Sequence, residues 1–216
     1  MKGFFITATD TNVGKTIVSA LIAKYLCIQN IEVNYHKLIQ TFSEQDCDKT
    51  TVHNLVNENL LKSSVGLSFK KPLSPHLAAH YANTHIDFSS LIDNFRKTFE
   101  NKLVITEGAG GLMVPINNSY LMIDAIKKLG LPTILVTRSS LGTINHTLLS
   151  IEALRSKNIK IHGLIMIGKN KDNLASIKYY SSIKNIFYQD YLSTVNNQTL
   201  TSSVINNQPL WRKFLC

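Results

Sequence analysis

A short loop near the N-terminus constrains this chain more than any other feature of its sequence. Residues 9–16 read Thr-Asp-Thr-Asn-Val-Gly-Lys-Thr; an apolar run over 3–8 precedes them, and apolar pairs at helical spacing follow over 15–29. The pattern predicts a buried strand, a tight turn and the start of a helix whose free N–H groups face an anion. Lys15 and Thr16 would then reach the outer phosphates and the Mg²⁺ of a bound nucleotide.

Strand and helix patterns alternate along the rest of the chain. Further strands are predicted over residues 31–37, 102–107, 132–137 and 161–167, and helices over 48–61, 76–82, 88–100, 121–129 and 143–157. Residues 38–47 are polar and predict a loop, and we expect little regular structure in the Asn/Ser/Thr-rich residues from about 190 to 216. The alternation is typical of a single α/β domain over 1–216, a P-loop fold with a mostly parallel central sheet and helices on both faces.

The composition is typical of a globular domain and excludes several other classes of protein. The 216 residues are 44% hydrophobic and 17% charged, as in a globular domain, and no apolar run is long enough for a membrane span. The net charge of +9 comes from scattered lysines without a basic stripe, so we expect no nucleic-acid partner and no membrane partner. Cys27, Cys47 and Cys216 share no metal-ligand spacing, which favours a reducing, cytoplasmic location.

Polar residues also stand at the predicted carboxyl ends of two other strands. Lys37 ends the strand over 31–37, and Glu107 ends the strand over 102–107, just before the glycine-rich residues 108–111. Ligands of open parallel sheets bind at this edge, and a carboxylate there suits Mg²⁺, directly or through water. Residues 142–145 begin a predicted helix, whose free N–H groups suit a carboxylate ligand.

Together these motifs resemble the dethiobiotin synthetase family, whose loop reads Gly-Thr-Asp-Thr-x-Val-Gly-Lys-Thr; here Ala8 replaces the first glycine. Lys37, residues 107–111 with Pro115, and residues 141–146 follow in the family's order, so the resemblance covers roughly residues 3–168. It implies an ATP- and Mg²⁺-dependent ligase that closes the ureido ring of dethiobiotin from 7,8-diaminopelargonic acid and CO₂ or bicarbonate. The implied course passes through a carbamate and a carbamic–phosphoric anhydride, in a homodimer with shared sites.

The resemblance also implies roles for individual residues. The catalytic residues would be Lys37, Lys15 and Thr11, and the Mg²⁺ ligands Thr16, Glu107 and Asp48, with Asp46 the competing aspartate. The nucleotide-binding residues would be Asp10, Thr11, Asn12, Val13, Gly14, Lys15, Thr16 and Ile17, with Gly168 and Asn170 near the base. The substrate-binding residues would be Thr41, Gly110 and Gly111, together with Leu141, Gly142, Thr143 and Asn145 from the neighbouring subunit.

The sequence departs from the family where the adenine is read. The family's adenine-reading asparagine falls at Gly168 or a neighbour, with Asn170 a displaced substitute, and residues 194–208 offer no counterpart of the closing C-terminal segment. We therefore expect weak discrimination between ATP and other nucleoside triphosphates.

The same loop leaves one alternative, a ParA/MinD-like switch ATPase. Such a loop would carry a second lysine near its start, in a Lys-Gly-Gly pattern, where this chain has Thr9-Asp10-Thr11.

Overall fold

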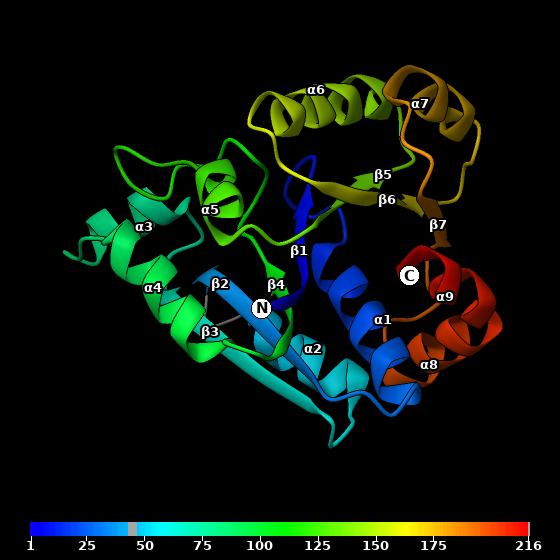
Figure 1. Cartoon of the computed structure of the whole chain (residues 1–216), viewed down its shortest axis with the longest axis horizontal. Helices are drawn as coiled ribbons and strands as arrows, with labels where there is room; N and C mark the ends of the chain where they lie inside the picture. The colour runs from blue at the N-terminus through cyan, green and yellow to red at the C-terminus, as the bar shows by residue number, and fades with distance from the viewer. Residues whose placement is uncertain (43–46, 216) are drawn as a thin grey trace.

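The computed structural model describes residues 1–42 and 47–215. Within them, a seven-stranded sheet runs in the order β3-β2-β4-β1-β5-β6-β7, and every neighbouring pair is parallel (Figure 1). The strands are β1 (Lys2–Ala8), β2 (Val33–Thr41), β3 (Leu61–Phe69), β4 (Leu103–Glu107), β5 (Thr133–Arg138), β6 (Ile161–Gly168) and β7 (Ile186–Asp190). The predicted α/β fold with a parallel sheet is confirmed.

Helices cover both faces of the sheet, as parallel sheets require. They are α1 (Lys15–Ile28), α2 (Asp48–Val56), α3 (Pro75–Tyr81), α4 (Phe88–Thr98), α5 (Met122–Leu129), α6 (Thr143–Ser156), α7 (Asn173–Ser181), α8 (Asn197–Asn206) and α9 (Gln208–Leu215). One face packs against α1, α2, α8 and α9, and the other against α3 to α7 (Figure 1). None of these helices is long and apolar enough to span a membrane.

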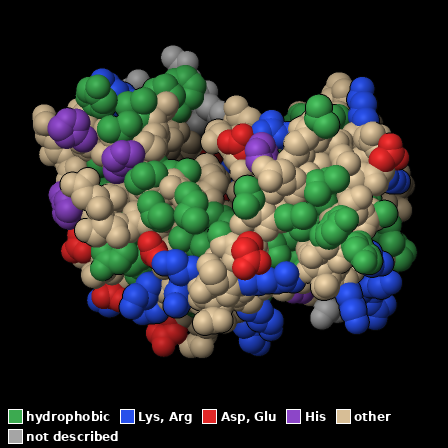
Figure 2. Space-filling model, turned by 90° about the horizontal axis from the view of Figure 1, so that it is seen from above, with side chains coloured by type: hydrophobic (Ala, Val, Ile, Leu, Met, Phe, Trp, Pro, Cys, Tyr) green, Lys and Arg blue, Asp and Glu red, His purple; other side chains and the backbone are tan. Residues whose placement is uncertain are grey.

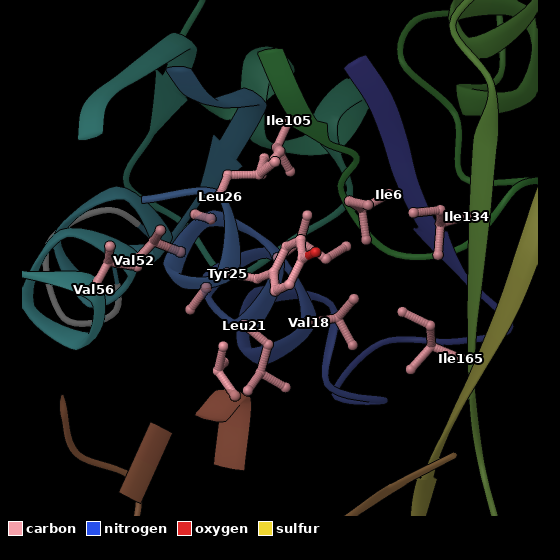
Figure 3. Packing of buried hydrophobic residues seen from close by; sticks show 14 of the residues in the cluster. Ile6, Val18, Leu21, Tyr25, Leu26, Val52, Val56, Ile105, Ile134 and Ile165 are labelled. Atoms are coloured by element: carbon pink, nitrogen blue, oxygen red, sulfur yellow. The ribbon is translucent and has the colours of Figure 1, made fainter. Parts of the chain in front are cut away.

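The helix that follows the phosphate loop is the centre of the first layer. Val18, Leu21 and Tyr25 of α1 pack against one isoleucine from each of four neighbouring strands (Figure 3). Those isoleucines are Ile6, Ile105, Ile134 and Ile165, and all four are fully buried. Burial of each such side chain contributes about 1.5–3 kcal/mol, so this packing fixes α1 and its first residue, Lys15, against the sheet.

The C-terminal segment corrects one prediction. Residues 197–215 form α8 and α9, where the polar composition had predicted little regular structure. A sparse set of apolar residues anchors both helices, namely Leu200, Val204, Trp211 and Phe214. The indole of Trp211 stacks on the ring of Phe187 at 4.0 Å, so one aromatic contact docks α9 on the edge strand β7. The remaining Asn, Ser and Thr side chains lie mainly at the surface.

The other differences concern both helices and strands: α7 was not predicted, and the helix predicted over 48–61 ends at Val56. β2 continues to Thr41, so the first part of the predicted loop over 38–47 is buried strand. β3 and β7 were not predicted, because each lies at an edge of the sheet and carries polar residues among its apolar ones. Edge strands lack the continuous apolar run by which a central parallel strand is recognised.

Strand register brings the predicted site together. β4 pairs with β1 on one side and with β2 on the other, so Glu107 lies opposite Ile6 and opposite Lys37. The carboxyl ends of three strands therefore meet beside the loop that follows Ala8. This is the edge at which open parallel sheets bind their ligands.

Candidate active site

The phosphate loop has the predicted form of a tight turn between a strand and a helix. Asn12 and Gly14 adopt left-handed φ angles of 57° and 107°, and α1 begins at Lys15. A side chain at Gly14 would be strained by this φ angle, and its Cβ atom would lie 2.5 Å from Cδ1 of Ile167, which would have to move. The Lys15 ammonium folds back over the loop and donates to the carbonyl oxygen of Asp10 at 3.0 Å.

A buried cluster of opposite charges lies beside this loop. Nζ of Lys37 is 2.6 Å from Oδ2 of Asp48 and 2.8 Å from Oε1 of Glu107, and it also donates to the carbonyl oxygen of Gly108 at 3.1 Å. The hydroxyl of Thr16 lies within hydrogen-bond distance of the same two carboxylates, at 2.7 Å from Asp48 and 3.1 Å from Glu107. Two of the residues that the sequence singled out, Lys37 and Thr16, thus contact both Glu107 and Asp48.

The second oxygen of Glu107 is held by two residues that the sequence analysis missed. The Tyr35 hydroxyl donates to Oε2 at 2.9 Å, and the Ser19 hydroxyl at 3.1 Å. All three side chains are buried. The signal was present in the spacing, because residues 35 and 37 share one face of a strand and residues 16 and 19 share one face of a helix.

Burial lowers the pKa of both lysines, and the neighbouring carboxylates raise it. Burial lowers the pKa of Lys15 from 10.5 to about 8; the Glu107 carboxylate opposes this shift, and the Lys37 ammonium adds to it. Burial would also lower the pKa of Lys37, but Glu107 and Asp48 together outweigh it and raise that pKa above 10.5. Lys37 is therefore a fixed cation, whereas the charge of Lys15 depends on what binds beside it.

Tyr35 remains a neutral donor in this cluster. Burial raises the pKa of its hydroxyl well above 10, and the adjacent Glu107 and Asp48 carboxylates add to the shift. The hydroxyl therefore keeps its proton and continues to donate to Glu107 throughout the neutral pH range.

A cleft of about 870 Å³ opens over the cluster. Most of the residues predicted for catalysis, metal and phosphate lie along it, namely Thr11, Asn12, Gly14, Lys15, Thr16, Ile17, Lys37, Asp48 and Glu107. Two residues predicted to bind substrate, Thr41 and Gly110, line it as well, and its far wall comes from residues 72–75. One side of the cleft therefore carries the phosphate loop and the lysines. The other side, at Thr41, Gly110 and residues 72–75, has room for a second substrate.

Other predicted residues lie elsewhere. Val13 is buried in the core. Gly111 packs under the loop, where a Cβ atom added to it would lie 3.3 Å from the Ala8 carbonyl oxygen. The carboxylate of Asp10 points towards Arg138. None of the segment Leu141, Gly142, Thr143 and Asn145 is among the described residues that line the cleft. Asp46 lies outside the described residues.

The predicted base-reading positions do not offer a preformed recognition site. At Gly168, with φ 153°, a Cβ atom would lie 1.8 Å from Oγ of Ser139, so no side chain fits there without rearrangement. Asn170 is exposed, and its side-chain oxygen accepts the backbone N–H of Asp172 at 2.7 Å. Both positions lie outside the set of described residues that line the cleft.

Comparison with known proteins adds to this geometry. Residues 2–199 match a family model described as an AAA domain. An ATP-dependent dethiobiotin synthetase BioD from Lawsonia intracellularis is 45% identical over 198 residues, which cover 91% of this chain and 92% of the relative. A protein of the same name from Methanocaldococcus jannaschii is 38% identical, covering 82% of this chain and 83% of the relative.

Solved structures share the fold at much lower identity. A ParA family ATPase from Chlorobium tepidum superposes with a TM-score of 0.62 at 10% identity, covering 100% of this chain and 98% of that one. The MinC:MinD complex from Aquifex aeolicus gives a TM-score of 0.59 at 11% identity, covering 100% and 96%. These likenesses establish the architecture alone, whereas the sequence relatives are 45% and 38% identical over most of this chain and of their own length. The chain belongs to the dethiobiotin synthetase family.

Proposed function

We propose that this chain is an ATP-dependent dethiobiotin synthetase, which joins 7,8-diaminopelargonic acid and CO₂ into the ureido ring of dethiobiotin in biotin biosynthesis. The observation that carries the proposal is the placement of Lys15, Lys37 and Glu107 along one cleft beside a phosphate loop. Relatives with this printed name, at 45% and 42% identity, support the same activity.

The proposed chemistry concentrates negative charge at one place. One amine of the substrate takes up CO₂ as a carbamate, and a carbamate oxygen then attacks the γ-phosphorus of ATP while ADP leaves. The second amine attacks the carbonyl carbon of the resulting mixed anhydride, and inorganic phosphate leaves as the ring closes. Catalysis of such steps depends mainly on positioned cations and N–H dipoles.

Lys37 and Lys15 supply the positive charge that this chemistry needs, each in a different way. Lys37 is 5% exposed and fixed between two carboxylates, so it presents a positioned ammonium from the middle of β2, beside Glu107 at the end of β4. Among the described residues, the Lys15 ammonium donates to the Asp10 carbonyl oxygen alone, so it can turn towards the outer phosphates. Thr11 and the N–H groups of the loop complete a site that binds and orients the transferred phosphoryl group.

Mg²⁺ fits the oxygen atoms that gather around Thr16. Its hydroxyl lies within hydrogen-bond distance of both Asp48 and Glu107, and a hydroxyl with two carboxylates is the hard-oxygen set that Mg²⁺ prefers. The described residues contain no group of three His, Cys, Asp or Glu side chains that could hold a metal. When bound, Mg²⁺ would neutralise charge on the phosphate oxygens.

We further propose a homodimer in which the start of α6 reaches the neighbouring subunit's diamine. Support comes from exposed apolar side chains at the start of that helix and along it: Leu141 is fully exposed, and Leu149 is 62% exposed. Figure 2 looks down on α6 and α7 and shows hydrophobic side chains spread over this face. A cytoplasmic location also remains part of the proposal; Cys27 and Cys47 are both free thiols.

The proposed function is tested by following carbon into the product. The protein is incubated with ATP, Mg²⁺, 7,8-diaminopelargonate and ¹³C-bicarbonate, and the products are analysed by mass spectrometry. The proposal predicts dethiobiotin that carries ¹³C in its ureido carbonyl group, together with one ADP for each ring closed. ATP hydrolysis without labelled dethiobiotin would contradict it.

A further inference from the structure

Asp10 accepts three hydrogen bonds, two from the phosphate loop and the start of α1 and one from the neighbouring strand β5. Its Oδ2 accepts from Nη2 of Arg138 at 2.8 Å, and its Oδ1 accepts from the backbone N–H of Thr11 at 2.7 Å. Its carbonyl oxygen accepts from the Lys15 ammonium at 3.0 Å. One residue therefore orients the backbone of Thr11, holds the Lys15 side chain and meets a cation from β5.

The position of Arg138 is fixed by the sheet. It is the last residue of β5, which pairs in parallel with β1 up to Ala8 and Val136. Thr9 continues this pairing through a bond from its N–H to the Val136 carbonyl oxygen at 3.0 Å. The guanidinium therefore emerges next to the start of the loop, and it approaches Asp10 from outside the cleft lining.

The Asp10 carboxylate poses an electrostatic problem for a loop of this kind. Nucleoside triphosphates are polyanions, and a negative side chain within the loop repels them through a partly solvated medium. A cation 2.8 Å from the carboxylate removes most of this repulsion and leaves Oδ1 free to orient Thr11. A guanidinium suits this task because its planar fork matches the geometry of a carboxylate.

We propose that Arg138 is a positioning residue for nucleotide binding: it neutralises Asp10 and fixes the loop that receives the triphosphate. The inference rests on the proposed function for its ligand, ATP. It differs from a direct phosphate contact by Arg138, because its effect passes through the Asp10 carboxylate. It also differs from a merely stabilising ion pair, since the two side chains are 39% and 53% exposed and such pairs add little to stability.

A double-mutant cycle on the full-length protein separates these possibilities. Arg138→Ala, Asp10→Asn and the double variant are compared with the wild type by calorimetric titration with Mg²⁺-ATP and by steady-state kinetics. Asp10→Asn keeps an oxygen acceptor for the Thr11 N–H but removes the charge. Lys62→Ala is the matched control, because it removes one lysine from an exposed ion pair with Glu32 at the far ends of β2 and β3.

We expect Arg138→Ala to raise the Kd and KM for ATP about threefold to tenfold, the effect of one uncompensated charge at a partly exposed site, with kcat changed less than twofold. In the Asp10→Asn background the same substitution should change Kd by less than about twofold, and Arg138→Lys should restore part of the loss. Lys62→Ala should leave Kd unchanged, and the thermal midpoints of all variants should lie close together.

Two results would overturn the inference while leaving the proposed function intact. If Arg138→Ala weakened ATP binding equally in both backgrounds, Arg138 would act on the phosphates directly. If it changed Kd no more than Lys62→Ala does, the ion pair would have no role in binding. A wild-type protein that fails to bind Mg²⁺-ATP would overturn both the inference and the ATP site of the proposed function.

Discussion

Two regions along the carboxyl edge of the sheet are built differently. We call the region at β1, β2 and β4 the first end and the region that follows β6 the second end. At the first end, Lys37 and Glu107 are buried and linked by ion pairs and hydrogen bonds below 3.2 Å. At the end of β6, Gly168 has no side chain, and the Asn170 side chain is exposed and engaged in a local turn. The first end is a preformed charge network, whereas the second offers main chain and solvated polar groups.

This difference separates two tasks of the proposed enzyme. Phosphoryl transfer needs charges held in place before the reaction starts, and buried charges remain in place only when their partners are fixed as well. Recognition of a base needs paired donors and acceptors, which the second end does not present. We therefore expect turnover to depend strongly on single residues at the first end. We expect selectivity for the base of the nucleotide, at the second end, to be weak.

The largest effect is expected from Lys37→Met, which removes the central cation of the first end. Turnover should fall roughly a thousandfold, the upper range for loss of one preorganised electrostatic group. Lys24→Met is the control, because Lys24 is 4% exposed and pairs with Glu58 at 2.6 Å but lies outside the cleft lining. The kcat of folded Lys24→Met should stay within a few fold of the wild type. An equal loss of turnover in both variants would show that turnover depends on a buried lysine in general and not on the position of Lys37.

A large pH effect on stability is expected from His36, next to Lys37 on β2. Burial lowers the pKa of its imidazole from 6.5 to about 4, so the folded state binds fewer protons than the unfolded state between these values. The stabilisation is complete above pH 6.5 and is lost as the pH falls towards 4, up to about 3 kcal/mol. Urea unfolding at several pH values should show this loss in the wild type and a flatter profile in His36→Gln.

A histidine at the amino end of β6, far along the strand from Gly168, provides the contrast for that measurement. His162 on β6 is half-buried, and burial lowers the pKa of its imidazole while the Phe214 carbonyl oxygen opposes the shift. His162→Gln should therefore alter the pH profile of stability less than His36→Gln does. Superimposable profiles for the wild type and His36→Gln would contradict the account of His36.

A smaller effect is expected from Glu107→Gln, which keeps the shape of the side chain but removes its charge. The Mg²⁺ concentration that gives half-maximal turnover should rise roughly tenfold to a hundredfold. Glu58→Gln serves as the control, because it removes a carboxylate that pairs with a buried lysine away from the cleft. An unchanged Mg²⁺ requirement in Glu107→Gln would remove Glu107 from the proposed metal site.

The smallest effect is expected from exchange of the base. ATP should exceed GTP and CTP by less than about tenfold in kcat/KM, because no paired donor and acceptor is preformed at Gly168 or Asn170. Steady-state kinetics with each triphosphate at saturating diamine and bicarbonate provide the test. A preference for ATP of a hundredfold or more would show that the second end recognises the base after all.

The sequence predicted the first end well because its signals are local. A strand, a glycine-lysine turn and a helix are contiguous in residues 2–28, and Glu107 directly precedes a glycine run. The roles of Tyr35 and Ser19 were missed because each depends on a partner, Glu107, that is 72 or 88 residues away in the chain. Spacing shows that two residues share a face, but only strand order shows what lies opposite that face.

The C-terminal region was predicted poorly for a different physical reason. α8 and α9 are held by few apolar contacts, above all Trp211 on Phe187, and their other residues favour loops by composition. Tertiary packing overrides local preference there. β3 and β7 escaped prediction similarly, since an edge strand needs apolar residues only where it meets the layers above and below.

The central claim is that the cleft transfers the γ-phosphoryl group of ATP only to a carbamate of the diamine. The most direct measurement is phosphate release from ATP and Mg²⁺, with 7,8-diaminopelargonate and bicarbonate present together, separately or not at all. The account predicts sustained release only when both are present, and its loss in Lys37→Ala. Release that is indifferent to the diamine would contradict the account and would indicate a simple ATPase on the same fold.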